Sequence, residues 1–325
     1  MMPKCLVLGA DGFMGSHLSE KLVEAGHEVV CFDRFRNGEP RHIKGLSFRT
    51  EVVHGDIRAT SALDKALTGC DIVFHFASAI KPYSDSVAPG KVIEEESDAA
   101  IQLFDLCVRH KIKKIIFPST GGAVYGGMPL SKSTISETHA ARPELAYAIH
   151  KRGLEKVLAQ YASEKKLNSC VLRISNCYGP RAPLRGTQGV ISIFMRHLAD
   201  GEPPLIYGDG RSVRDYVYVT DVISAIILSA MNPTRHAIYN IGAAEGYSVI
   251  EIFEKIREIA ERDIRPVFRE ARQNEIPRIV LNTDRFRREF LWRPRVDFET
   301  GLRQVWQWIV NETQTSSLKQ IAEKA

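Results

Sequence analysis

Two residues of one short segment, Tyr147 and Lys151, have the types and the spacing for proton transfer. Positions four apart on a helix share a face, so the phenol and the ammonium would stand side by side. A neighbouring cation favours the phenolate, and we therefore expect Lys151 to lower the pKa of Tyr147 toward neutral pH. Such a tyrosine could act as a general base toward a hydroxyl and as an acid toward a ketone. We expect His150, between them, to be a solvated helix histidine.

A second chemical feature is a turn with three glycines, Gly9, Gly12 and Gly15, between an apolar run and a helix. Gly9 allows a sharp turn, Gly12 lets backbone amides approach a pyrophosphate, and Gly15 lets helix and strand pack closely. The N-terminus of the helix adds N–H groups and a positive dipole end. This arrangement predicts a dinucleotide site.

The acid at the end of the second apolar run, Asp33, is placed to bind the ribose hydroxyls of NAD. Its carboxylate would repel the 2′-phosphate of NADP. Arg34 and Arg36 follow directly, and a guanidinium there could accept that phosphate instead. We predict NAD, with NADP as the alternative.

These residues require a scaffold, and the pattern up to about residue 178 supplies one by alternating strands and helices. The expected strands are 4–8, 28–33, 48–53, 71–75, 115–117 and 170–174, and the expected helices are 16–25, 61–67, 92–109 and 144–161. Such alternation predicts a parallel sheet covered on both faces, with ligands at the carboxyl ends of its strands. We predict an α/β protein with a doubly wound Rossmann domain over residues 1–178.

After Tyr178 the alternation breaks down, and prolines and glycines cluster at 179–189 and 201–210. We predict that residues 179–325 form mainly a smaller, substrate-binding lobe, with segments that return to the sheet.

Composition narrows the class of protein. The chain has 325 residues and a formal charge of +5, and its late arginines alternate with acids, so we expect no nucleic-acid partner. No apolar run reaches membrane length and the N-terminus reads as a core strand, so we expect a cytoplasmic protein without a membrane partner. Of the six cysteines, Cys5, Cys31, Cys107 and Cys170 lie in apolar patterns and no C-x-x-C pair occurs. We expect buried thiols and no metal site.

Together the motifs resemble the extended short-chain dehydrogenase/reductases, specifically the nucleotide-sugar epimerase group typified by UDP-glucose 4-epimerase. The resemblance spans nearly the whole chain and rests on these segments: G9-A-D-G-F-M-G15, D33, D56-I57, H75-F-A77, S119-T-G-G-A-V-Y-G126, Y147-x-x-x-K151, R173-I-S-N-C-Y-G-P180, G208-D-G-R-S-V-R-D-Y-V-Y-V219 and Y239-N-I-G242. Late in the chain R272-Q-N-E stands where the family usually has R-x-G-D.

The resemblance implies roles for individual residues. It places the amides of Phe13 and Met14 at the pyrophosphate, Asp56 and Ile57 beside adenine, and Lys151 also at the nicotinamide ribose. The full implied cofactor set is Gly9, Gly12, Phe13, Met14, Gly15, Asp33, Arg34, Asn37, Gly38, Asp56, Ile57, Phe76, Ala77, Ser78, Tyr147, Lys151 and Ser175. The implied substrate set is Asn176, Arg214 and Arg272 at a diphosphate, Tyr207 stacked on the base, and Val190 and Leu205.

Three departures from the family pattern bear on the chemistry. The usual catalytic Ser or Thr, four residues before Tyr125, is Gly121 here, so Thr120 or Ser119 would have to supply the hydroxyl. An asparagine usual on the long helix is replaced near residues 96–98. The acidic pair that follows Thr in sugar 4,6-dehydratases is absent, because Gly121 and Gly122 occupy its place.

The resemblance predicts an NAD-dependent C4 epimerase of a UDP-hexose or UDP-N-acetylhexosamine, acting through a transient 4-keto sugar. The alternatives are a one-way relative (a reductase, dehydrogenase or decarboxylase) and a non-catalytic NAD-binding regulator. The family also implies a homodimer, formed through helices 92–109 and 144–161.

Overall fold

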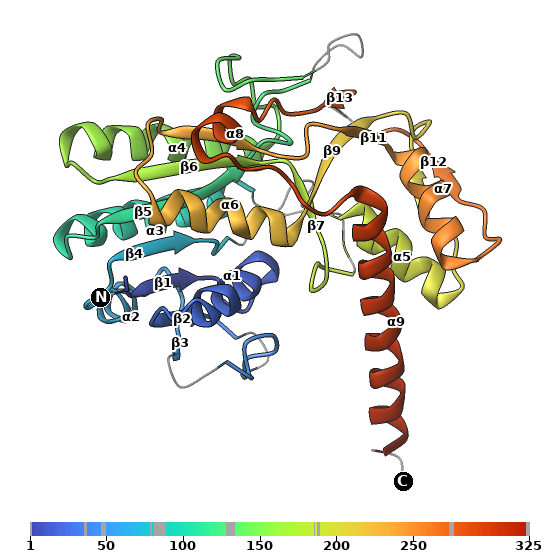
Figure 1. Ribbon diagram of the computed structural model, residues 1–325, viewed down its shortest axis with the longest axis horizontal. Helices are drawn as coiled ribbons and strands as arrows, with labels where there is room; N and C mark the ends of the chain where they lie inside the picture. The colour runs from blue at the N-terminus through green and yellow to red at the C-terminus, as the bar shows by residue number, and fades with distance from the viewer. Residues whose placement is uncertain are drawn as a thin grey trace.

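The structure is a computed structural model that describes residues 2–35, 38–46, 50–78, 80, 89–127, 134–184, 186, 189–272 and 276–322; residues 89 and 314–322 are described by their backbone only. Its centre is a seven-stranded sheet in which every pairing is parallel (Figure 1). In spatial order the strands are β10 (Ile238–Ile241), β6 (Ser169–Ile174), β5 (Lys114–Thr120), β4 (Ile72–His75), β1 (Cys5–Leu8), β2 (Val29–Asp33) and β3 (Thr50–His54). The order reverses between β1 and β4, which is the doubly wound arrangement, so the predicted fold class is confirmed.

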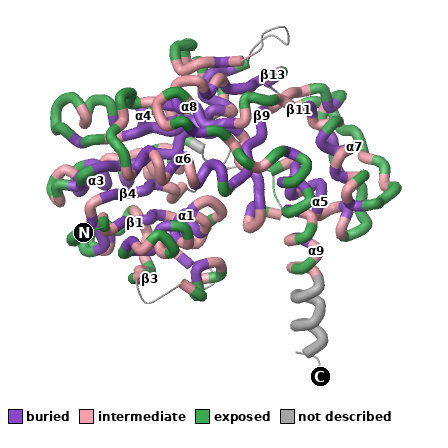
Figure 2. The backbone as a smooth tube through the Cα atoms, in the orientation of Figure 1, coloured by how far each residue is buried: buried purple, intermediate pink, exposed green. Residues whose placement is uncertain are grey.

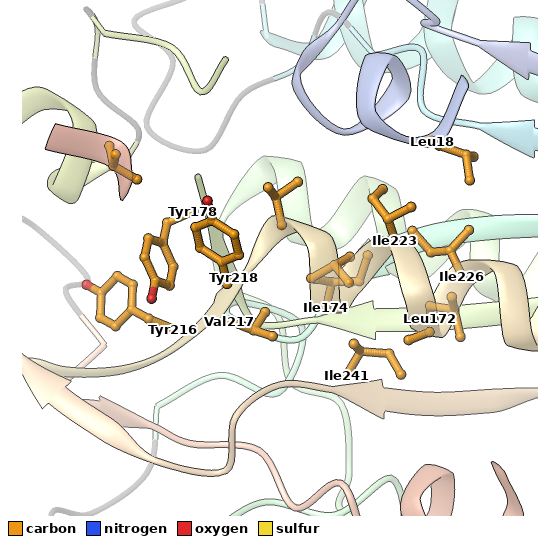
Figure 3. Close-up of a cluster of buried hydrophobic side chains, with 14 of the residues drawn as sticks. Leu18, Leu172, Ile174, Tyr178, Tyr216, Val217, Tyr218, Ile223, Ile226 and Ile241 are labelled. Atoms are coloured by element: carbon orange, nitrogen blue, oxygen red, sulfur yellow. The ribbon is translucent and has the colours of Figure 1, made fainter. Parts of the chain in front are cut away.

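Apolar side chains leave both faces of this sheet. On one face Cys5 and Val7 of β1 pack with α1 (Phe13–Glu24) and α6 (Val219–Met231). On the other face Leu6 and Leu8 pack with α2 (Thr60–Ala66), α3 (Pro89–Arg109) and α4 (Ala146–Glu164). Figure 3 shows the first cluster, with Leu18 of α1 opposite β6 and α6, and Figure 2 shows the strands of the sheet largely buried. Strands buried on both faces explain why the sequence reads as continuous apolar runs.

The second lobe is built around β9 (Val213–Tyr218), which pairs with β7 (Asn176–Tyr178), β11 (Gly246–Ser248) and β13 (Arg278–Ile279). A separate pair joins β8 (Leu205–Tyr207) to β12 (Val267–Arg269). The helices of this half are α5 (Val190–Asp200), α7 (Val249–Ala260), α8 (Asp284–Phe290) and α9 (Phe298–Ala322). The far end of α9 projects from the body of the molecule (Figure 1).

The buried carboxylate of Asp215, on β9, links the second lobe to the end of the central sheet. It accepts hydrogen bonds from the Ser175 hydroxyl (3.1 Å) and from the backbone amides of Ala243 (2.9 Å), Ala244 (3.1 Å) and Leu281 (3.2 Å). Burial raises the pKa of Asp215 to about 6, although these hydrogen bonds act in the opposite direction. Ser175 separates β6 from β7, so the carboxylate holds the crossing point between the sheet and the second lobe.

Several predicted boundaries differ from the structure by one to three residues, among them the ends of α3 (Pro89–Arg109), α4 (Ala146–Glu164) and β5 (Lys114–Thr120). Helix α1 begins at Phe13 rather than at Ser16, because Gly12 already takes the extended N-cap conformation. The third strand is described over Thr50–His54 and ends one residue later than predicted, while the predicted strand residues 48 and 49 lie outside the described residues. Cys5, Cys31, Cys107 and Cys170 are buried free thiols, as expected. Among the helices of the described segments, none is both long and apolar enough to cross a membrane.

Candidate active site

The turn after β1 has the geometry that its glycines predict. Gly9 lies at φ +82°, and a Cβ on Gly15 would overlap the carbonyl oxygen of Gly9, so helix and strand meet here backbone to backbone. Gly12 caps α1 without a side chain. The first-turn N–H groups of Phe13 and Met14 have no intrahelical acceptor, which leaves them for an anion.

A cavity of about 460 Å³ opens where the strand order reverses. It is lined by ten of the predicted cofactor residues: Gly9, Gly12, Phe13, Asp33, Arg34, Asp56, Ile57, Phe76, Ala77 and Ser78. Its wall also includes residues that sequence reasoning missed, among them Asp11, Arg58, Val92, Glu95 and Glu96. A larger cleft of about 700 Å³ lies between β9 and residues 292–299, and none of the predicted site residues lines it.

Charges around Asp33 suit ribose hydroxyls better than an additional phosphate. Its Oδ2 accepts the amide of Asp11 at 3.0 Å, which fixes the carboxylate at the end of β2. Arg34 lies 3.8 Å from Asp56, and Arg58 donates to the same carboxylate at 2.7 Å. The hydrogen bonds from Arg58 lower the pKa of Asp56 to about 2. Asp56 is therefore an anion at neutral pH, and it lies next to the guanidinium groups of both Arg34 and Arg58. The residues present therefore fit NAD.

The other predicted cofactor residues are placed differently. Met14 packs against the core with part of its side chain, and Gly38 lies at φ +83° in the loop after β2. The Ser175 hydroxyl is committed to Asp215. Asn37 lies outside the described residues, as does Arg36, one of the two arginines named for the NADP alternative.

Tyr147 and Lys151 lie on α4, but the expected effect of the lysine on the tyrosine is wrong for this structure. Burial and the nearby Glu96 raise the pKa of Tyr147 to about 12. The Lys151 ammonium donates to the carbonyl of Pro118 at 3.3 Å and lies 4.7 Å from the centroid of the Phe117 ring. Burial lowers the pKa of Lys151 to about 8. For the pKa of Tyr147, desolvation of the phenolate outweighs the effect of the Lys151 cation. Desolvation disfavours the charged form of both residues, the Tyr147 phenolate and the Lys151 ammonium.

His150 is not a solvated residue as expected, because its side chain is only 2% exposed. The packing of α3 against α4 covers it, and its Nδ1 lies 3.1 Å from the Ser97 hydroxyl. Its Nε2 lies 3.8 Å from a carboxylate oxygen of Glu96. Glu96 is one of the three residues, 96–98, near which the family pattern has an asparagine.

The missing hydroxyl at position 121 has a steric reason. A Cβ on Gly121 would overlap the side chain of Leu281 and lie 2.9 Å from the carbonyl oxygen of Arg173. Ser119 is buried, and its hydroxyl donates to Glu155 at 2.6 Å. Thr120 is partly exposed at the carboxyl end of β5. Of the two predicted hydroxyls, only that of Thr120 is free of the Glu155 network.

That network was not predicted from the sequence. Arg173 donates to Glu155 at 3.0 Å through Nε and at 2.6 Å through Nη2, and Arg152 donates at 2.7 Å. Burial alone would raise the pKa of Glu155, but the hydrogen bonds outweigh it and the pKa is lowered. Arg173 also stacks on the Tyr125 ring at 4.8 Å. The network joins β5, β6 and α4 near the carboxyl end of β5.

The predicted substrate residues are spread over several elements. The Asn176 amide donates to the backbone oxygen of Asp215 at 3.1 Å and faces Gly122. The guanidinium of Arg272, three residues past the end of β12, lies 4.1 Å from the centroid of the Tyr207 ring on β8. Leu205 and Tyr207 are each 37% exposed, so this pair offers an open surface for a planar ring.

The remaining two substrate residues lie on other elements. Arg214 is partly buried on β9 and donates to the carbonyl of Val213 at 3.0 Å. Val190 opens α5 after Gly189, which takes a left-handed conformation.

A doubly wound sheet, a glycine turn after its first strand and a tyrosine–lysine pair on one helix are typical of nucleotide-binding enzymes of the dehydrogenase type. Residues 5–242 match the NAD dependent epimerase/dehydratase family, and the chain belongs to this family of nucleotide-sugar-modifying proteins. The predicted resemblance is therefore confirmed.

Relatives with different reactions cover nearly the whole chain. A Methanocaldococcus jannaschii protein provisionally named a UDP-glucose 4-epimerase is 32% identical over 95% of this chain and 99% of its own length. The UDP-N-acetyl-alpha-D-glucosaminuronate decarboxylase of Bacillus cytotoxicus is 29% identical, over 95% of this chain and 98% of its own. The crystal structure of UDP-glucose 4-epimerase from Thermotoga maritima with UDP-glucose superposes with a TM-score of 0.87 at 31% identity, covering 95% and 99% of the two chains.

Proposed function

We propose that the protein is an NAD-dependent C4 epimerase of a UDP-hexose or UDP-N-acetylhexosamine. The observation that carries the proposal is the placement of Tyr147 and Lys151 on α4, on either side of His150, whose Nε2 lies 3.8 Å from the carboxylate of Glu96, a residue that lines the cavity after β1. An acid–base group at the edge of a dinucleotide groove can remove and return the proton of a sugar hydroxyl.

Each residue of the pair has a distinct task in this proposal. Tyr147 takes the proton of the C4 hydroxyl and gives it back to the 4-keto sugar. Lys151 provides the positive charge that stabilises the phenolate, and the Thr120 hydroxyl donates to the sugar oxygen. Bound NAD supplies the acceptor and donor for the hydrogen on C4. Because the hydrogen and the proton both return, the reaction consumes no cofactor.

The nucleotide half of the substrate is assigned to the second lobe. We propose that Arg214, Arg272 and Asn176 bind the diphosphate and that Tyr207 stacks on the base. Arginine forks match phosphate oxygens. A substrate held by its diphosphate leaves the keto sugar free to present either face.

A one-way oxidoreductase is the second candidate. The relatives include the Bacillus cytotoxicus decarboxylase and a dTDP-4-dehydro-6-deoxyglucose reductase of Escherichia coli, 30% identical to this chain. Dehydration of the sugar is disfavoured, because Gly121 and Gly122 carry no acid and Gly121 has no room for one. A regulator without activity is disfavoured by the presence of both Tyr147 and Lys151.

The test is incubation of the purified protein with UDP-glucose, UDP-galactose and their N-acetylhexosamine counterparts, without added cofactor, in deuterated water. Inversion at C4 with the original hydrogen retained, followed by NMR, supports internal return of the hydrogen. Tyr147→Phe is the matched control and should show no inversion. Conversion of added NAD to NADH in proportion to product would replace the epimerase with the one-way enzyme.

A further inference from the structure

The carboxylate of Glu96, on α3, is in contact with two other elements, the turn after β4 and the helix α4. Its Oε2 accepts the Ser78 hydroxyl at 2.8 Å, and its Oε1 accepts the Ile80 amide at 3.2 Å, both from the turn after β4. The same Oε2 lies 3.8 Å from Nε2 of His150 on α4, and the Glu96 side chain is only 11% exposed. Glu96 therefore links the turn that lines the cofactor groove to the helix that carries the acid–base residues.

The tautomer of His150 follows from its hydrogen bonds. The Ser97 hydroxyl donates its single proton to the carbonyl of Ile93 at 2.7 Å. The contact between Ser97 and Nδ1 of His150, at 3.1 Å, must then use the proton on Nδ1. Nε2 is left with its lone pair facing Glu96. Burial lowers the pKa of His150 to about 4, so at neutral pH the imidazole does not neutralise the carboxylate.

The charge of Glu96 consequently acts on the two groups nearest the chemistry. It raises the pKa of Lys151, against the effect of burial, and it raises the pKa of Tyr147, together with burial. The other titratable groups packed here have little effect on the charges of Tyr147 and Lys151. His75 on β4 is buried with its pKa lowered to about 3, and the charge of Glu155 is taken up by its arginines.

We propose that Glu96 is a positioning residue that holds Lys151 as a cation and Tyr147 as a neutral phenol, while it clamps the cofactor turn to α4. The proposal rests on the proposed acid–base roles of Tyr147 and Lys151. An anion close to a lysine stabilises the ammonium form, and an anion close to a phenol disfavours the phenolate. Turnover requires the Tyr147 phenolate and the Lys151 ammonium at the same time. Glu96 thereby shifts the pH range of turnover toward higher pH.

The test removes the charge and keeps the shape. Glu96→Gln preserves an acceptor for Ser78, Glu96→Asp preserves the charge, and Asp98→Asn removes a charge from an exposed position of the same helix. The first readout is the ionisation of Tyr147 itself, measured by NMR of tyrosine labelled with ¹³C at Cζ and assigned with Tyr147→Phe. Every variant is compared with wild type in the same nucleotide state.

We expect the midpoint for Tyr147 to fall by about one pH unit in Glu96→Gln, the lower end of the shift caused by a near charge. It should stay in place in Asp98→Asn and close to wild type in Glu96→Asp. The pH profile of turnover should move to lower pH by the same amount in Glu96→Gln. A reduced rate with an unmoved profile and an unmoved Tyr147 midpoint would leave Glu96 only a structural brace and overturn the proposal.

If Glu96→Gln does not fold, Glu96→Asn removes the same charge with the amide that the family usually has on this helix. An unmoved Tyr147 midpoint in Glu96→Asn would likewise overturn the proposal. The NMR measurement needs no substrate, so failure of the epimerase reaction leaves the outcome for Glu96 readable.

Discussion

Replacing Glu155 by alanine should remove the anion of the network under the site. It would leave the Arg173 guanidinium, whose side chain is 3% exposed, without its partner. Breaking a buried pair by removing one member costs about 3–5 kcal/mol. The Ser119 hydroxyl loses its acceptor as well, at a cost of about 1 kcal/mol. We expect the free energy of unfolding to fall by about 5 kcal/mol.

The assay is urea unfolding at pH 7, with two matched variants. Arg152 is 28% exposed, so Arg152→Ala should cost less than about 1 kcal/mol. The double variant Glu155→Leu with Arg173→Met replaces both charges by apolar groups and should recover most of the loss.

The dependence on pH has a defined sign. The pKa of Glu155 is lowered in the folded protein, so its contribution is complete above the unfolded value of about 4.3 and is lost as pH falls through the folded pKa. The gap between wild type and Glu155→Ala should therefore shrink in acid. A loss below about 1 kcal/mol at pH 7, or a gap that widens in acid, would refute the reasoning.

Four further outcomes are expected. Tyr147→Phe should lower turnover by about 10²–10⁴ and leave the cofactor bound, measured by steady-state rates and nucleotide content; near wild-type turnover would remove Tyr147 from the mechanism. Nucleotide released by denaturation should be NAD by mass spectrometry, and NADP would overturn the role given to Asp33. Light scattering at micromolar concentration should give twice the 36.5 kDa chain mass. Ile149 on α4 is 52% exposed, and Ile149→Glu should give monomers. A monomeric wild-type protein would refute the predicted dimer. His75 and His150 are buried with pKa values of about 3 and 4, so these histidines take up protons at higher pH in the unfolded chain than in the folded protein. The free energy of unfolding should therefore fall below pH 6.5, by up to about 1.4 kcal/mol per pH unit for each histidine. Urea midpoints at pH 7 and 5 test this: the fall should be smaller in His150→Gln, and a fall equal to that of wild type in this variant would contradict the prediction.

The sequence predicted the parts of the fold that depend on neighbours in the chain. The first strand, its glycine turn and its helix are a continuous segment, and apolar runs buried on both faces are readable as strands. The place of β10 beside β6 is a non-local pairing of four residues, and no short pattern specifies its partner. The start of α1 shifted because cap geometry depends on the backbone of Gly12 and not on a capping side chain.

For the site, the spacing of Tyr147 and Lys151 predicted that both lie on one helix, but it did not predict which side chains pack around them. The burial of His150 and the pKa of Tyr147 both depend on α3, which carries Ser97 and Glu96. Whether Ser119 is free or committed depends on Glu155, which lies on another element. Such electrostatic effects come from packing between elements, and periodicity within one element does not encode them.

The edge position of β10 has a consequence for dissecting the molecule. A fragment that stops at Tyr178, where the two lobes were predicted to divide, would contain six of the seven strands and would leave the outer edge of β6 unpaired. It would also lose α6, which covers Leu172 and Ile174 on one face of the sheet. An exposed edge flanked by uncovered apolar side chains is a template for aggregation. Limited proteolysis or gene truncation between the lobes should therefore yield insoluble pieces, and the chain must be synthesised past Ile241 before its sheet is complete.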